Sequence, residues 1–119
     1  YYGGGSGNSV RGIFQGGYIA PSTTGQNTID YVTIASEGNA IDFGERSVGG
    51  SYGCATASQT RYFMIGGRDT SNTTPGHNVI EYVNIASTGK ALDFGDISWT
   101  ARYFAIGVLS DSHGGLGGF

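Results

Sequence analysis

Short runs of β-branched and aromatic residues with a period of two dominate the hydrophobic pattern of this chain. The clearest run interleaves two sets of side chains, Ile29, Tyr31 and Thr33 in one set and Asp30, Val32 and Ile34 in the other. Such alternation predicts a β-strand, because successive side chains of a strand point to opposite faces of a sheet. No apolar stripe with helical spacing interrupts these runs, so the sequence predicts an all-β chain.

A long internal repeat organises these runs. The stretch IDYVTIASEGNAIDFG, residues 29–44, returns as IEYVNIASTGKALDFG, residues 80–95, with eleven of the sixteen positions identical. Arg11 and Arg61 lie 50 residues apart, and a Gly-Gly pair follows each of them. A period of about 51 residues predicts a repeat architecture rather than one irregular domain.

Each unit is predicted to contain two β-hairpins. Gly38 and Gly89 fall in the turns of the two related hairpins, where glycine accepts a positive φ. The whole chain, 1–119, is taken as a single repeat domain. Its parts are a partial unit 1–17, hairpins 27–44, 50–67 and 78–95, and a partial unit 100–119.

Four short antiparallel strands at this period are typical of a β-propeller blade. One such sheet cannot bury both faces alone, so each blade needs neighbours. A length of 119 residues leaves room for only about 2.3 such units, fewer than a closed ring requires. We therefore expect the chain to be an ordered portion of a longer repeat protein. The alternative is an assembly in which the terminal half-blades of different chains pair.

Composition narrows the class of protein. Twenty-three residues are glycine, 13% are charged and the net charge is −3, which suits an extracellular or virion protein. No basic run is available for phosphate contacts, so we expect no nucleic-acid partner. No apolar run approaches the length of a membrane-spanning helix. The lone Cys54 cannot form an intrachain disulfide and is expected to be a buried thiol.

The tripeptide DFG at 42–44 and 93–95 also occurs as a magnesium-binding motif in protein kinases. The other kinase motifs are missing and the chain is too short, so that interpretation is set aside. We expect the aspartates to accept hydrogen bonds from amides and the phenylalanines to pack between blades. The glycines are expected to let the chain leave the sheet.

No catalytic or metal-binding set stands out, and the chain is not expected to be an enzyme or to need a cofactor. His77 and His113 occupy unrelated loops, and serines and aspartates are too common to indicate a triad. Segments 67–72 and 110–113 offer oxygen ligands for Ca²⁺, but turn chemistry explains the same residues.

The two units differ most in the loop after the Gly-Gly pair, residues 18–28 in one and 68–79 in the other. Loops on a rigid scaffold are where recognition usually resides. An aromatic face and polar side chains of this kind suit sugars. The candidate ligand-binding residues are Tyr18, Arg68, Asp69, Asn72 and His77.

These units resemble the kelch repeat family, in which an apolar strand ends in Gly-Gly and a later strand carries tyrosine. Phe43 and Phe94 stand near the place of the kelch tryptophan. The resemblance implies kelch-like β-propeller blades. The repeat positions that it assigns a structural duty are Gly16, Gly17, Tyr31, Asp42, Phe43, Gly44, Gly66, Gly67, Tyr82, Asp93, Phe94 and Gly95.

The segments NTIDYVTIASEGNAIDFG, 27–44, and ALDFGDISWTARY, 91–103, also resemble tandem repeats of tail-fibre and virion proteins of tailed phages, many of them marine. That resemblance implies a non-enzymatic structural or recognition module at the virion tail or surface. Its expected partners are further repeats or copies of the same protein and host-surface glycan.

Two other functions stay open at this point. One is a secreted cellular protein for carbohydrate binding or adhesion, which would be extracellular. The other is a polysaccharide-degrading enzyme, which needs two carboxylates facing one cleft. Asp42 and Asp93 recur at equivalent positions, and this favours a structural duty in each unit.

Overall fold

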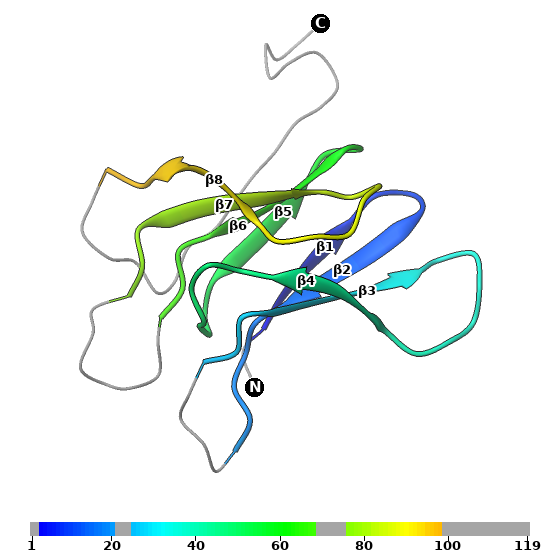
Figure 1. Ribbon diagram of the computed structural model, residues 1–119, viewed down its shortest axis with the longest axis horizontal. Coiled ribbons are helices and arrows are strands. Elements are labelled where there is room, and N and C mark those ends of the chain that lie inside the picture. The colour runs from blue at the N-terminus through cyan, green and yellow to red at the C-terminus, as the bar shows by residue number, and fades with distance from the viewer. Residues whose placement is uncertain (1–2, 21–24, 69–75, 99–119) are drawn as a thin grey trace, which may run out of the picture.

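A computed structural model describes residues 3–20, 25–68 and 76–98 of the chain. These residues form strands and turns without any helix, which confirms the all-β prediction (Figure 1). The strands are β1 (Gly4–Gly7), β2 (Arg11–Gln15), β3 (Thr28–Thr33), β4 (Ile41–Glu45), β5 (Cys54–Ala57), β6 (Arg61–Ile65), β7 (Val79–Asn84) and β8 (Leu92–Asp96).

The strands form two four-stranded antiparallel sheets with the same strand order. We call β1-β2-β3-β4 the first sheet and β5-β6-β7-β8 the second sheet. The registers are equivalent as well: Ile13 lies opposite Tyr31 in the first sheet, and Phe63 lies opposite Tyr82 in the second. The sequence repeat is therefore a repeat of one complete sheet.

A Gly-Gly pair ends the second strand of each sheet. Gly16 and Gly17 follow β2 with φ of 64° and 94°, and Gly66 and Gly67 follow β6 with φ of 62° and 112°. These angles lie in the left-handed region, where a side chain would be strained. The pairs turn the chain out of the sheet and into the long loops.

The DFG segments form a β-bulge in the last strand of each sheet. The pairing shifts between Ile29 and Asp30 in the first sheet, and at the equivalent place in the second. Asp42 accepts a hydrogen bond from the amide of Gly44 at 3.1 Å, and Asp93 accepts one from Gly95 at 3.0 Å. We expected these glycines to let the chain leave the sheet, but each lies inside its strand, which continues one residue further.

The two sheets lie face to face as layers, with the apolar core between them (Figure 1). Strand β1 of the first sheet runs beside β5 of the second. The first sheet contributes Ile13, Ile29 and Phe43 to the core. The second sheet contributes Tyr62, Met64 and Val83, and the turn that follows β7 contributes Ile85. Each sheet therefore buries one face against the other.

Candidate functional site

The long divergent loops leave the sheets at one common end, opposite the short hairpin turns. Residues 16–27 connect β2 to β3, and residues 66–78 make the same connection from β6 to β7. Because the strands are antiparallel and in sequence order, these connections share an end with the link 46–53 between the sheets. Figure 1 shows the described ends of both loops at the lower left. We call this the loop end.

Backbone hydrogen bonds tie the first loop to the link between the sheets. The amide of Gly17 donates to the carbonyl of Gly50 at 3.0 Å, and the amide of Gly50 donates to Gln26 at 3.2 Å. Gly25 approaches Gly50 so closely that a side-chain carbon on Gly25 would lie 2.6 Å from the Gly50 Cα. The base of this loop is therefore fixed by main-chain contacts.

The second loop is tied to the same link. Ser51 and Arg68 exchange two backbone hydrogen bonds, at 2.9 and 2.8 Å. The amide of His77 donates to Gly67 at 2.7 Å, and its ring Nε2 lies 3.2 Å from the carbonyl oxygen of Gly49. The link thus brings the two loops together on one rigid base.

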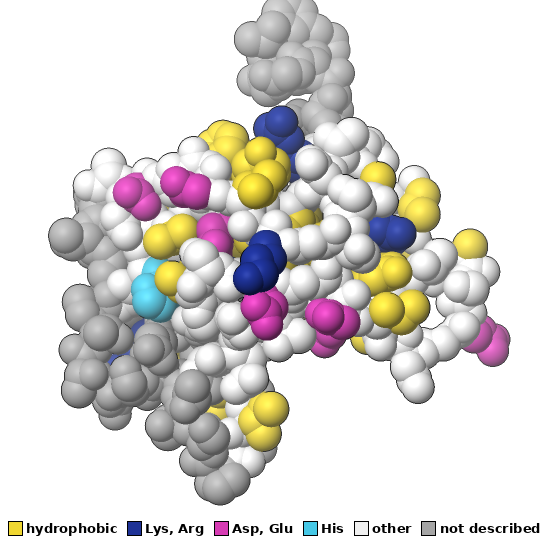
Figure 2. Space-filling model, in the orientation of Figure 1, with side chains coloured by type: hydrophobic (Ala, Val, Ile, Leu, Met, Phe, Trp, Pro, Cys, Tyr) yellow, Lys and Arg dark blue, Asp and Glu magenta, His cyan; other side chains and the backbone are white. Residues whose placement is uncertain are grey.

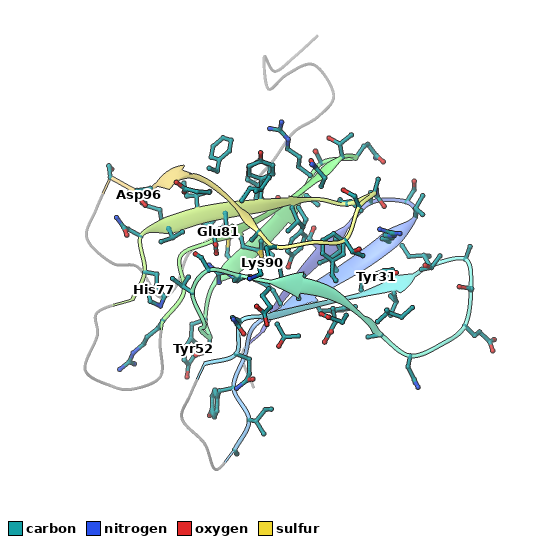
Figure 3. All side chains as sticks on the ribbon, in the orientation of Figure 1. Tyr31, Tyr52, His77, Glu81, Lys90 and Asp96 are labelled. Carbon is teal, nitrogen blue, oxygen red and sulfur yellow. The ribbon has the colours of Figure 1, made fainter. Side chains whose placement is uncertain are left out.

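Tyr18, Arg68 and His77, three of the predicted ligand-binding residues, lie at the loop end and are half-buried. Asp69 and Asn72 lie outside the described residues. Sequence reasoning did not single out Tyr52 for this end, yet Figure 3 shows it on the same side of the molecule as His77. Tyr52 adopts a φ of 61°, which is rare for a bulky residue and occurs most often at functional or tightly packed sites.

A hollow of 650 Å³ opens beside the loop end, on the face of the first sheet that points away from the second. Phe14 and Asp30, which lie opposite each other in β2 and β3, line it. Ile19, 66% exposed, also lines the hollow. The hollow therefore has an apolar wall with one carboxylate in it.

A buried ion pair joins the two sheets. Arg46 Nε lies 2.9 Å from Glu81 Oε2, and both side chains are almost inaccessible to solvent. Arg46 also donates to the carbonyl of Gly66 at 3.2 Å, and the amide of Ser47 donates to Glu81 Oε1 at 2.8 Å. The carboxylate is thereby neutralised and holds the link against the second sheet.

An arginine also covers the tyrosine of each unit. The guanidinium of Arg11 lies 4.5 Å from the ring centre of Tyr31, and that of Arg61 lies 4.9 Å from that of Tyr82. Arg11 additionally donates to the carbonyl of Ile85 in the neighbouring sheet at 2.6 Å. Arg11 therefore contacts a tyrosine of its own sheet and a backbone carbonyl of the neighbouring sheet.

Edge hydrogen bonds extend the contact between the sheets along β4. The amide of Gly89 donates to the carbonyl of Phe43 at 2.8 Å, and the amide of Ala91 donates to Glu45 at 2.9 Å. A side-chain carbon on Gly44 would lie 2.1 Å from the Gly89 carbonyl oxygen. The glycine of the first DFG therefore permits a close approach between sheets.

The titratable groups of the described residues include no metal-binding cluster and one buried phenol. Among the described residues, no group of three or more His, Cys, Asp or Glu side chains is placed to hold a metal ion. Burial between the sheets raises the pKa of the Tyr62 phenol above its ordinary value, and nearby Arg46 opposes that rise. Tyr62 is therefore a neutral core residue.

Comparisons with known proteins leave the chain without an assigned family. No protein-family model matches the sequence, and no curated protein is significantly similar to it. In the described part of the chain, no helix has the length and apolar character needed to cross a membrane. The features of the chain that bear on its function are the repeat, the stacked sheets and the loop end.

Proposed function

We propose that this chain is a non-enzymatic structural and recognition module, a pair of stacked kelch-like propeller blades at the surface of a phage tail fibre or virion. The observation that carries the proposal is the repetition of one complete sheet, with the same order and register, packed face to face. Units that bury their faces only against neighbours are suited to rigid, extendable scaffolds. The phage assignment rests on the resemblance of segments 27–44 and 91–103.

The loop end is the part of the molecule that we propose binds a ligand. Its backbone is held by hydrogen bonds to the link, while the loop sequences differ between the units. A fixed base with variable loops is the usual design of a binding surface. Tyr18 supplies an aromatic face for sugar C–H groups, and Arg68 and His77 supply hydrogen-bonding groups. The ligand class that fits is host-surface glycan.

Three carboxylates of the described residues support a structural assignment. Asp42 and Asp93 accept hydrogen bonds from their own chain at equivalent positions, and Glu81 is neutralised by Arg46. Glycoside hydrolysis needs two carboxyl groups that face one substrate across a cleft. Measurable turnover of a bacterial polysaccharide by the purified chain would overturn the non-enzymatic assignment.

The test is binding to arrayed bacterial surface glycans. Wild-type chain is expected to bind a subset of them, and Tyr18→Ala and Arg68→Ala are each expected to weaken binding at least tenfold. Glu37→Ala is the matched control, because Glu37 is exposed in a hairpin turn at the opposite end of the first sheet. Arrays on which the wild type binds nothing, or on which all three variants bind equally, would contradict the recognition role.

A further inference from the structure

The contact between the sheets indicates what should cover the outer face of the first sheet. By the repeat, the positions of Met64 and Glu81 in the second sheet correspond to Phe14 and Asp30 in the first. Met64 and Glu81 are 0% and 1% exposed beneath the first sheet, whereas Phe14 is 50% exposed and lines the open hollow with Asp30. The outer face of the first sheet thus repeats a face that is buried in the second.

The acidic residue on that face needs a cation if it is buried. Glu81 meets this need through Arg46, which extends from the link just after β4 of the preceding sheet. Within the described residues, no ion pair reaches Asp30. A carboxylate removed from water without a partner costs several kcal/mol, so an apolar cover alone would be unfavourable.

Among the described residues, a second copy of this chain offers no cation at the equivalent position. In a head-to-tail contact that repeats the internal one, the second sheet of another copy would lie on the outer face of the first. The residue equivalent to Arg46 would then be Ile97, and the backbone positions match: Arg46 donates to Asn27 and Ile97 to Asn78, both at 2.7 Å. An isoleucine would therefore face Asp30. In a second copy, Arg46 is itself already engaged by Glu81.

We propose that the outer face of the first sheet, formed by Gly5, Phe14, Asp30 and Val32, docks a further four-stranded sheet of this repeat that carries arginine at the Arg46 position. The arginine pairs with Asp30 as Arg46 pairs with Glu81, and the apolar face of the incoming sheet covers Phe14. Charge complementarity at the described residues fixes the order and direction of stacking and disfavours self-stacking through Ile97. The inference rests on the stacking half of the proposed function and is independent of glycan binding.

The test places the missing arginine in this chain. Ile97→Arg is expected to let the second sheet of one copy dock on the first sheet of another, in a head-to-tail contact. Sedimentation velocity of the full chain should then show concentration-dependent association, at least tenfold tighter than that of the wild type. The association should weaken as salt rises. Ile97→Lys, which offers a point charge without the planar fork, should give a smaller gain.

Two controls make the result specific. Ile97→Arg combined with Asp30→Asn should return association to the wild-type level, and Ile97→Met should leave it there. Unfolding curves like that of the wild type show that each variant folds. Failure of Ile97→Arg to associate, or its association regardless of Asp30→Asn, would overturn the proposal. Equally tight association of the wild type would identify a second copy as the occupant and also overturn it. Glycan arrays that show no binding would leave this result unaffected, so the two failures are distinguishable.

Discussion

The two sheets place the same kinds of residue at the same positions, but only in the first sheet is that face covered. Phe43 in β4 is 2% exposed beneath the second sheet, whereas Phe94, its equivalent in β8, is 57% exposed. Phe94 instead meets Phe63 and Tyr82 at ring-centre distances of 5.1 and 6.1 Å in an aromatic cluster. Figure 2 shows hydrophobic side chains gathered with a basic one over this part of the second sheet. Burial in this repeat therefore comes from the neighbouring sheet and not from within a unit.

The polar residues of the interface differ between the sheets in the same way. Glu81 is buried with Arg46, whereas Asp30 lies in an open hollow and Ile97 replaces the arginine. Equivalent positions can thus be compared inside one molecule, one covered and one open. Substitutions at such pairs measure what the contact between the sheets contributes.

The largest effect is expected at the buried ion pair. Arg46→Ala leaves Glu81 charged and unpaired between the sheets, which should lower the free energy of unfolding by about 3–5 kcal/mol. Asp30→Asn, at the open equivalent of Glu81, should change it by less than about 0.5 kcal/mol. Urea unfolding of both variants measures the difference.

A double replacement sharpens this result. Arg46→Met together with Glu81→Leu removes both charges and keeps the volume filled, so it should recover most of the stability lost in Arg46→Ala. Equal stability of Arg46→Ala and Asp30→Asn would mean that Glu81 is not enclosed between the sheets.

The equivalent residues Phe43 and Phe94 should give the next largest difference in the free energy of unfolding. Phe43→Ala opens a cavity in the core and should destabilise the protein by about 3–4 kcal/mol. Phe94→Ala removes an exposed ring whose contacts among the described residues lie within its own sheet, and it should cost about 1 kcal/mol. The comparison uses the same unfolding measurement, and equal losses would show that both rings are equally covered.

A third comparison isolates the close approach at β4. Gly44 and Gly95 have nearly the same φ, 150° and 147°, so alanine suffers similar backbone strain at both positions. An added carbon meets the Gly89 carbonyl only at Gly44, and nothing lies within 4 Å of it at Gly95. Thermal unfolding should therefore show Gly44→Ala less stable than Gly95→Ala by about 1–3 kcal/mol. A smaller loss at Gly44 than at Gly95 would contradict the contact.

The smallest effect concerns alkaline pH. Burial raises the pKa of Tyr62 above the value of about 10 that the phenol has in the unfolded chain, so the native state favours the neutral form. This contribution is complete below pH 10 and is lost as pH rises further, because the unfolded chain gains stability by ionising. The loss is at most about 1.4 kcal/mol per pH unit. Tyr62→Phe should remove it, so the stability difference between wild type and variant should shift in favour of the variant above pH 10. A difference that is constant from pH 8 to 11 would show that Tyr62 is not buried.

The strands and their pairing could be predicted from the sequence, because the alternation of side chains and the internal repeat indicate the same elements. A strand is predicted by the alternation of side chains in 29–34. The ends of two strands are predicted by the repeated Gly-Gly pairs at 16–17 and 66–67. Which face of a strand is buried does not follow, because Tyr31 and Val32 are both apolar and point to opposite faces. Each sheet carries apolar residues on both faces, such as Ile13 and Phe14 in β2, so alternation in polarity is weak.

The contacts between the sheets were outside the reach of sequence reasoning. Arg46 follows a strand and Glu81 lies within another, and each alone is typical of a solvated surface. Their pairing depends on how one sheet sits on the next. One signal was available: an acidic residue, Asp30 or Glu81, holds the same strand position in both units, as a shared role requires. The loop residues were found from their divergence, but Tyr52 was not, because its conformation is not encoded in a local motif.

The most direct measurement compares the solvent accessibility of Phe43 and Phe94 in solution. A soluble paramagnetic agent added during NMR should strongly broaden the ring protons of Phe94 and leave those of Phe43 nearly unchanged, since their exposed fractions are 57% and 2%. That result would confirm that one sheet covers the other and that the equivalent face of the second sheet is open. Equal protection of both rings, or stronger broadening of Phe43, would contradict it.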